Sequence, residues 1–239
     1  MTWRPFSPGA PRAGTANPSR MDNPVWTWLV HTRLCGFRAN EALEGPCSTV
    51  VGPCWSFRRF GQARVRLPDG TLVCIGGEHE DHDDPDFHIY NDVVVCLSRT
   101  AASTCRPIRW TSSSRSIFIR PRWPHEQIVI IGALGYEAQR RHACTPVYSL
   151  SLRTFAITRI ATTGEGPGWI ARHAARLCDG GSAIAIGGGA VMPRADAYPE
   201  ANLHTWRLDL ATWNWTCERR SDWQQCIVLA GGRAPQSPV

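Results

Sequence analysis

The sequence predicts an all-β fold that follows one short helix. From residue 53 onward, apolar and polar residues alternate in short segments, which is typical of strands with one buried face. Turn sequences such as Pro-Asp-Gly and Asp-Gly-Gly separate some of these segments. Three apolar segments also end in glycine at nearly constant spacing. A repeated β unit is therefore the first structural hypothesis for this chain.

The N-terminal part divides into two segments. Residues 1–21 are expected to be disordered, because their four prolines stand among small residues with few apolar side chains. Met21 is a second candidate for the start of the translated chain. Residues 22–45 carry apolar side chains three and four positions apart, which predicts an amphipathic helix. Pro24 suits its first turn, and residues 53–239 then form the β domain.

Composition excludes several classes of protein. The chain has 239 residues, of which 43% are hydrophobic and 19% charged, so it can bury a core. No apolar run approaches the roughly 20 residues of a membrane helix, and no N-terminal apolar segment resembles a secretory signal. The ten cysteines form no Cys-x-x-Cys pair. We therefore expect a cytoplasmic protein with no membrane association and with its cysteines reduced.

Glycine spacing defines the repeat. Apolar runs end at Gly76-Gly77, at Gly132 and at Gly187-Gly188, so successive units are 56 and 55 residues apart (132 − 76 and 187 − 132). After each glycine the pattern predicts a polar loop and two further strands. The predicted third strands are 91–97, 147–152 and 203–210, and the predicted fourth strands are 106–110, 155–160 and 213–217. One unit is then four antiparallel strands, the content of one β-propeller blade.

Aromatic residues at corresponding places in the units resemble the kelch repeat. The matching residues are Gly76, Gly77 and Tyr90 in the first unit, Gly132 and Tyr148 in the second, and Gly187, Gly188, Trp206 and Trp215 in the third. The second unit departs from the pattern, because Ala133 follows its glycine and its fourth strand lacks tryptophan. The resemblance implies a propeller of the galactose oxidase/kelch superfamily, with glycine where neighbouring blades crowd together and with the aromatic side chains filling the space between consecutive blades. A β-sandwich with coincidental glycines is the alternative.

The number of units predicts an incomplete propeller of three to four blades. Closed propellers typically have four to eight blades. Residues 227–232 resemble the second strand of a fourth unit, but no third strand follows. The N-terminal segment could complete a blade, or self-association or another partner could close the ring. A truncated or frame-shifted chain is the remaining explanation.

An acidic segment follows the first glycine pair. It holds the six carboxylates Glu78, Glu80, Asp81, Asp83, Asp84 and Asp86 and the three histidines His79, His82 and His88. Three interpretations are open: a solvated connection between strands, a site for a divalent ion, or a docking surface for a basic partner. The spacing matches neither an EF-hand nor HExxH, so we predict no metal and no cofactor. We take the segment as the candidate docking surface.

Strand parity places this segment at one end of the fold with other loops. Loops between second and third strands emerge together in an up-and-down blade, which brings Arg140 and Arg141 to the same face. The charge of that face is mixed, so we expect no nucleic-acid partner. The kelch resemblance implies a scaffold for protein–protein interaction without catalytic residues, whose partner is unknown. The alternative is a propeller enzyme of the same superfamily that acts on a sugar or another small metabolite.

Overall fold

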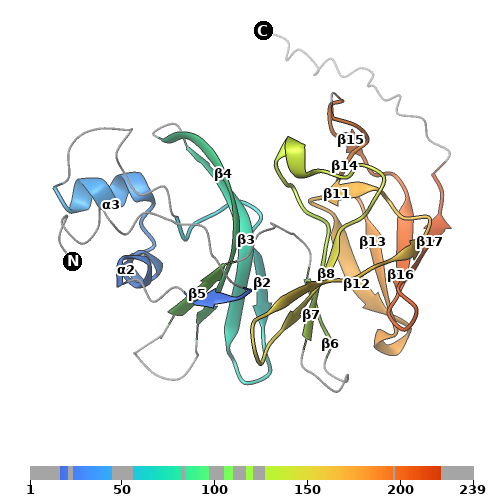
Figure 1. The fold of residues 1–239 in the computed structure, drawn as a ribbon, viewed down its shortest axis with the longest axis horizontal. Coiled ribbons are helices and arrows are strands. Elements are labelled where there is room, and N and C mark those ends of the chain that lie inside the picture. The colour runs from blue at the N-terminus through green and yellow to red at the C-terminus, as the bar shows by residue number, and fades with distance from the viewer. Residues whose placement is uncertain are drawn as a thin grey trace, which may run out of the picture.

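The computed structural model describes residues 17–20, 24–44, 56–81, 84–96, 105–109, 117–120, 127–195 and 197–221. Most of the regular secondary structure is β-strand, paired antiparallel except between β10 (Thr163–Gly164) and β17 (Asn214–Arg219), which confirms the predicted all-β class (Figure 1). Two helices, α2 (Pro24–Thr32) and α3 (Gly36–Ala42), occupy the segment in which the sequence predicts one. Arg33 separates them because its φ of 58° leaves the helical region. Neither helix is long and apolar enough to cross a membrane.

Three sheets contain the predicted four-strand units in order. The first sheet has the order β1-β5-β4-β3-β2, the second β6-β7-β8-β9, and the third β10-β17-β16-β13-β12. The strands of the first sheet are β1 (Ser19–Arg20), β2 (Ala63–Arg66), β3 (Leu72–Asp81), β4 (Asp84–Cys96) and β5 (Cys105–Arg109). Those of the second are β6 (Ile117–Arg120), β7 (Gln127–Ile131), β8 (Val147–Ser151) and β9 (Ile157–Arg159). Those of the third are β10 (Thr163–Gly164), β12 (Ala174–Cys178), β13 (Ala183–Gly187), β16 (Thr205–Asp209) and β17 (Asn214–Arg219).

A smaller sheet lies beside one end of the third sheet. It consists of β11 (Trp169–Ala171), β14 (Ala190–Met192) and β15 (Glu200–Ala201), all antiparallel. Two short 3-10 helices, η2 (Glu137–Gln139) and η3 (Asp179–Gly181), interrupt the connections between strands. In Figure 1 this sheet and η2 lie at the upper end of the molecule, where β3 leads into β4. No sheet closes on itself within the described residues.

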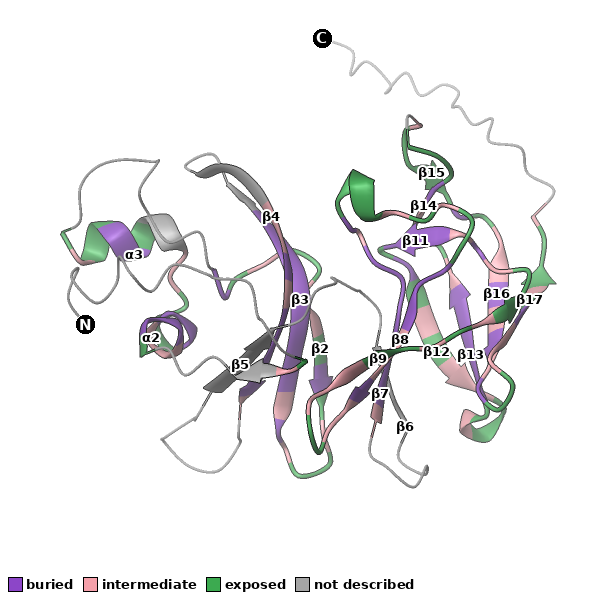
Figure 2. Cartoon of the chain, in the orientation of Figure 1, coloured by how far each residue is buried: buried purple, intermediate pink, exposed green. Residues whose placement is uncertain are grey.

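The three large sheets pack face to face in sequence order. Strand β7 contributes to both interfaces, because successive side chains of a strand point to opposite faces. Ile128 and Ile130 join the core shared with the first sheet, while Val129 and Ile131 join the core shared with the third. All four are buried (Figure 2). The first strands also lie near one another, since β6 contacts both β2 and β12.

The two helices cover the outer face of the first sheet. Trp26 and Leu29 of α2 are fully buried and join a cluster with Cys74, Tyr90 and Val94 of the sheet. Alternation along β3 explains the arrangement, because Val73 and Ile75 face the second sheet and Cys74 faces the helices. The central strands β3 and β4 of the first sheet are therefore buried on both faces.

The outer face of the third sheet has a different composition. One row of paired residues across the strands β12, β13, β16 and β17 consists of Arg176, Ala185, Arg207 and Thr216. The alternating positions Ile184, Ile186 and Leu208 point toward the second sheet. The described residues of this outer face are thus small or polar, whereas its inner face is apolar. Residues 222–239, which include the predicted part of a fourth unit, lie outside the described residues.

Part of the segment predicted to be disordered is ordered. Ser19–Arg20 forms β1 and pairs with β5. The side-chain amide of Asn17 donates to the Ile157 carbonyl at 2.7 Å, and the Ile157 N–H donates to the Asn17 side-chain oxygen at 3.0 Å. Residues 17–20 therefore join the first sheet to β9 of the second, and the prediction of disorder is wrong for them. Residues 1–16 lie outside the described residues.

The repeat glycines do not all serve the predicted purpose. Gly132 has a φ of 72°, and a Cβ there would lie 2.4 Å from the Ile170 carbonyl oxygen. Gly187 is different, because its φ is not positive and the nearest non-neighbouring atom would be 3.9 Å away. The predicted crowding at Gly187 is therefore wrong. In the third unit it is Gly189 that is crowded, since its φ is 79° and a Cβ there would lie 2.5 Å from the Ala171 carbonyl oxygen.

This difference predicts unequal effects of the same substitution. Gly132→Ala should lower the free energy of unfolding by about 2–4 kcal/mol, because the backbone conformation and the Ile170 carbonyl both oppose a Cβ. Gly187→Ala should cost less than about 1 kcal/mol, since an alanine fits a strand with free space. Urea denaturation midpoints compare the two variants. Equal losses would show that the close approach of Ile170 to Gly132 is not present in solution.

The contacts of Asn17 give a second prediction. Asn17→Ala removes both hydrogen bonds to Ile157 and should destabilise the protein by about 1 kcal/mol. Thr158→Ala, at an exposed position of the same strand β9, is the control and should have a smaller effect. The measurement is thermal unfolding followed by circular dichroism. Equal melting temperatures for the two variants would contradict the proposed link.

Candidate functional site

Exposed apolar side chains gather at one end of the fold. We call this the loop end: the connections from β3 to β4, β7 to β8 and β13 to β16, with the links that enter β2 and β12. The exposed large apolar residues of the described chain are Phe60 (65% exposed), Tyr136 (42%), Tyr198 (92%) and Leu203 (41%). All four belong to loop-end segments. The loop end is therefore the candidate binding surface.

The smaller sheet and its neighbours hold the loop end in shape. Trp169 of β11 packs with Ala133 and Met192, and its indole N–H donates to the Leu134 carbonyl at 3.1 Å. The His142 ring nitrogen Nδ1 lies 2.8 Å from the Met192 carbonyl oxygen. These contacts connect the loop of the second unit to that of the third. The two loops therefore form one packed layer at the end of the sheets.

Tyr136 and Arg140 extend this packing. The Ile89 N–H of β4 donates to the Tyr136 hydroxyl at 2.9 Å, which joins the first unit to the loop of the second. Arg140 is half-buried, and its Nε donates to the carbonyls of Leu134 and Gly135, both at 3.2 Å. Arg141 is exposed. Of the two predicted binding arginines, Arg140 thus holds the loop, and Arg141 is the one presented to solvent.

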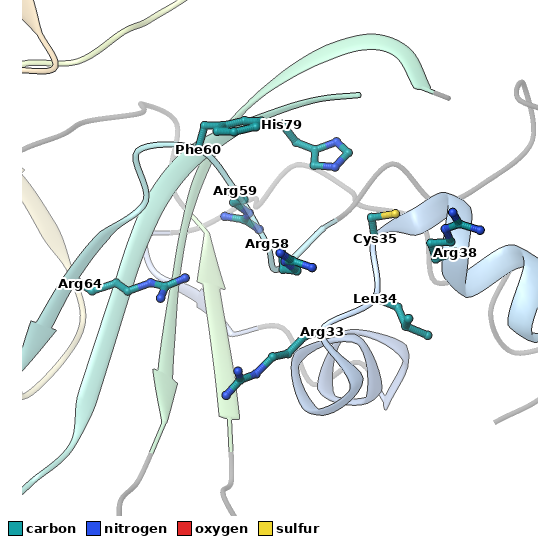
Figure 3. A pocket seen from close by; sticks show the side chains of 9 residues that line it. All are labelled: Arg33, Leu34, Cys35, Arg38, Arg58, Arg59, Phe60, Arg64 and His79. Carbon is teal, nitrogen blue, oxygen red and sulfur yellow. The ribbon is translucent and has the colours of Figure 1, made fainter. Parts of the chain in front are cut away.

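The acidic segment is largely strand. The β3–β4 ladder continues past an irregularity at Ile75–Gly77, and it pairs Glu78 with Ile89 and His79 with His88. Glu78 and His79 are only 4% and 7% exposed, so their predicted position on an exposed connection is wrong. His79 instead lines a cavity beside the helices (Figure 3).

The other acidic residues lie beyond what can be described. The side chains of Glu80, Asp81, His82, Asp83, Asp84 and Asp86 lie outside the described part of the structure. Their role in docking stays a prediction. Within the described residues, no three His, Cys, Asp or Glu side chains gather as a metal site.

An ion pair joins the first and third units across the loop end. The Arg172 guanidinium lies 3.0 Å from the Glu78 carboxylate, measured from Nη2 to Oε1. Glu78 is buried while Arg172 is largely exposed. Arg172 has a φ of 57°, and this backbone conformation precedes the entry of the chain into β12. The two residues are 94 positions apart, so sequence patterns carried no signal for this contact.

His173 is buried where the second and third units meet. A Cβ on Gly132 would lie 2.8 Å from His173 Cε1, and a Cβ on Gly189 would lie 2.5 Å from the His173 backbone nitrogen. Glycine at both positions therefore leaves room for His173. Burial lowers the pKa of His173 to about 4, because the charged ring loses its hydration. The ring is neutral at neutral pH.

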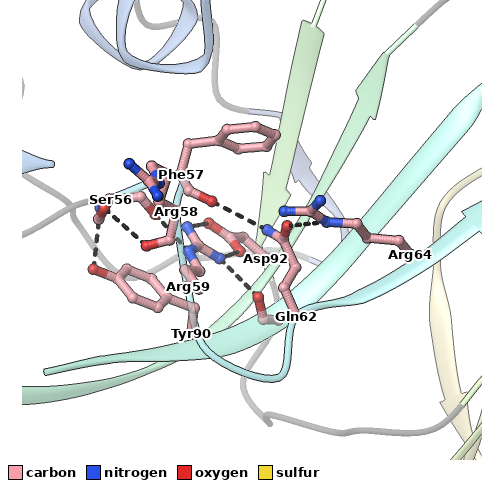
Figure 4. A network of polar contacts seen from close by, with 9 residues as sticks. Ser56, Phe57, Arg58, Arg59, Gln62, Arg64, Tyr90 and Asp92 are labelled. Carbon is pink, nitrogen blue, oxygen red and sulfur yellow. Dashed lines mark hydrogen bonds and ion pairs between the residues drawn. The ribbon is translucent and has the colours of Figure 1, made fainter. Parts of the chain in front are cut away.

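A buried arginine network fixes the link that enters the first sheet (Figure 4). The Arg59 guanidinium forms a bidentate ion pair with the Asp92 carboxylate, and both side chains are fully or almost fully buried. Arg59 also donates to the Gly76 carbonyl at 3.1 Å and lies 3.5 Å above the Tyr90 ring. The Tyr90 hydroxyl accepts the Ser56 N–H at 3.1 Å. Tyr90, recognised from sequence as a repeat aromatic, is thus the platform for this cation.

The other repeat aromatics lie between sheets, as the repeat predicts. Trp206 and Trp215 are buried in the core between the second and third sheets. The Trp206 indole N–H donates to the Asn202 side-chain oxygen at 3.1 Å. Tyr148 packs against the core between the first and second sheets. These side chains stabilise the stack rather than form a site.

The Arg59 network predicts that removal of the Asp92 charge strongly destabilises the protein. Asp92→Asn leaves the buried Arg59 guanidinium without its counter-charge and should destabilise the protein by about 3–5 kcal/mol. Glu41→Gln is the control, because it breaks the exposed Arg38–Glu41 pair and should cost less than about 1 kcal/mol. Urea unfolding at neutral pH measures both. Similar losses of unfolding free energy in Asp92→Asn and Glu41→Gln would mean that the Arg59 guanidinium is not buried.

The burial of His173 predicts a pH dependence of stability. Its pKa is about 4 in the folded protein and 6.5 for an ordinary histidine, so the unfolded chain takes up the proton first as pH falls. Its contribution is complete above pH 6.5 and is lost as the pH falls toward 4. In His173→Gln, the loss of unfolding free energy between pH 7 and pH 4.5 should be smaller than in the unsubstituted chain by about 2 kcal/mol. Identical pH profiles would contradict burial of the ring.

Comparison with known proteins assigns no family. No protein-family model matches the chain, and no curated protein matches it in sequence. A solved structure described as "Structure of YjhT" aligns at 14% sequence identity with a TM-score of 0.48. The alignment covers 74% of this chain and 54% of that one. The present chain thus spans about half the length of that structure.

Proposed function

We propose that this chain is a kelch-like β-propeller scaffold that binds a protein partner through its loop end. The propeller half of the proposal is supported by the order of the sheets. Each of the three large sheets contains four antiparallel strands that neighbour one another in chain order, except that β14 and β15 come between β13 and β16. The sheets stack in sequence order with apolar cores between them. The first strands contact one another, since β6 contacts both β2 and β12. The glycines that end the second strands favoured those strands for the positions next to a propeller axis, but contact between corresponding strands fits blades arranged around a common axis.

One observation carries the binding half of the proposal. The exposed large apolar side chains of the described residues all belong to loop-end segments, and Tyr198 is 92% exposed. Tyrosine is enriched among residues that dominate protein–protein binding energies. A surface of this composition fits a protein partner.

Rigidity supports the same function. The indole of Trp169, the ring of His142 and the guanidinium of Arg140 each bond to a backbone carbonyl of the loop end. A loop that is already ordered loses less conformational entropy when it binds. The loop end therefore presents its aromatic residues on a scaffold that needs little rearrangement.

The charges of the loop end indicate the kind of partner. Exposed Arg141 and Arg172 lie in the same set of segments as exposed Glu137 and Glu200. This mixture differs from the continuous basic stripe of a nucleic-acid surface. The partner should accordingly offer an apolar patch bordered by both signs of charge.

Affinity capture with matched variants tests this function. Tyr198→Ala removes the most exposed aromatic side chain, and Arg66→Ala/Arg153→Ala truncates exposed side chains at the opposite end of the strands. A true partner should bind the unsubstituted chain and the control equally, and should bind Tyr198→Ala about tenfold more weakly. The affinities are measured by biolayer interferometry on the captured protein. Equal binding by all three chains would exclude the loop end as the interface.

A metabolite screen addresses the enzymatic alternative. The same three chains are heated with sugars and other small metabolites while unfolding is monitored. A metabolite without a phosphate group that raises the melting temperature of all three, together with failure to capture any partner, would favour the propeller enzyme. Under the proposed scaffold function, no metabolite should stabilise the chain at the loop end.

A further inference from the structure

A cavity between the helices and the first sheet is unusually rich in arginine. It has a volume of about 480 Å³, and five arginines line it (Figure 3). They are Arg33, Arg38, Arg58, Arg59 and Arg64. We call this the arginine pocket. It involves the helical segment and β2, and so it goes beyond the loop-end function proposed above.

Two of the five charges are neutralised by carboxylates. Arg59 pairs with Asp92 inside the sheet, and Arg38 pairs with Glu41 at 2.8 Å. Among the residues that the structure describes, Arg33, Arg58 and Arg64 have no carboxylate within ion-pair distance. The Arg64 Nε donates to the neutral side chain of Gln62 at 3.1 Å. Three positive charges therefore share one pocket, and their mutual repulsion favours the uptake of an anion.

These three arginines come from separate parts of the chain. Arg33 follows α2 in a left-handed conformation, Arg58 lies in the link before β2, and Arg64 lies within β2. Figure 3 shows their side chains around the same space between α2 and the sheet. The fold thus brings together three guanidinium groups from different elements.

A second cavity continues the arginine pocket. Its volume is about 660 Å³, and it shares Arg33, Arg58 and Arg64 with the first. Its wall also includes the apolar side chains of Val30, Phe57 and Leu72. The shared arginines therefore border both cavities, and apolar side chains lie beside them in the wall of the second. A ligand that used both would carry an anionic group and an apolar body.

We propose that the arginine pocket binds a small phosphate monoester with an apolar or aromatic body. A guanidinium group offers parallel N–H donors that match phosphate oxygens, and it keeps its charge at all accessible pH values. A phosphate monoester carries nearly two negative charges, whereas a carboxylate carries one. Three arginines without a described carboxylate partner fit the more highly charged group. The cavity volumes also lie in the range of pockets for small molecules.

Calorimetric titration with phenyl phosphate tests the proposal, with inorganic phosphate and benzoate as comparison ligands at constant ionic strength. Phenyl phosphate should bind saturably and more tightly than either comparison ligand, because it alone combines the phosphate with an aromatic body. If inorganic phosphate binds as tightly as phenyl phosphate, the apolar wall takes no part and the ester proposal is wrong. If benzoate binds as tightly, the preference for phosphate is wrong.

Matched charge variants locate the binding. Arg33→Gln/Arg58→Gln should weaken phenyl phosphate binding at least about tenfold. Arg153→Gln/Arg159→Gln removes the same charge from exposed positions around β9 and should change it less than about twofold. Arg64→Gln provides a second variant if the first double variant does not fold. Equal weakening by both double variants, or no saturable binding to the unsubstituted chain, would overturn the proposal.

Discussion

The structure depends on the burial of strand β7 on both of its faces. Its central residues Ile128–Ile131 are all apolar and all buried, and they alternate between the core with the first sheet and the core with the third. A strand with one solvated face would show polar residues at every second position. Because β7 has none in this run, the second sheet is stable only between its two neighbours. The three sheets are therefore one cooperative stack, in which loss of either outer sheet exposes half of β7 to water.

Close backbone approach at the loop end is the second requirement of this stack. His173 reaches the junction of the second and third units because Gly132 and Gly189 leave space for it, while Arg172 beside it pairs with Glu78 of the first unit. Two consecutive residues thus contact all three units. The exposed residues Tyr136 and Tyr198 belong to the loops that contain Gly132 and Gly189, so the proposed binding surface and this junction share two loops.

The repeat was predictable from sequence because its signals are local. Glycine spacing, strand alternation and turn residues located the four-strand units, and Trp206 and Trp215 lie between sheets as expected. The contacts that define the candidate sites were not predictable, because they join residues far apart in the chain. Arg59 and Asp92 are 33 positions apart and Arg172 and Glu78 are 94 apart, and the acidic segment that contains Glu78 gave no indication of its partner. The predicted exposure of Glu78 and His79 in the acidic segment was wrong because backbone pairing with β4 continues through both residues despite their polar side chains.

The two outer faces of the stack differ in composition, and their composition affects whether a further sheet can pack on them. Repeat proteins commonly stop growing at units whose outer face is polar or covered. Here α2 and α3 cover one end, and the row Arg176, Ala185, Arg207 and Thr216 lies on the other. A further sheet packed on that row would have to dehydrate guanidinium groups, one of which already pairs with Asp179. Within the described residues, packing a further sheet on this face would therefore carry a desolvation cost that the apolar inner faces do not.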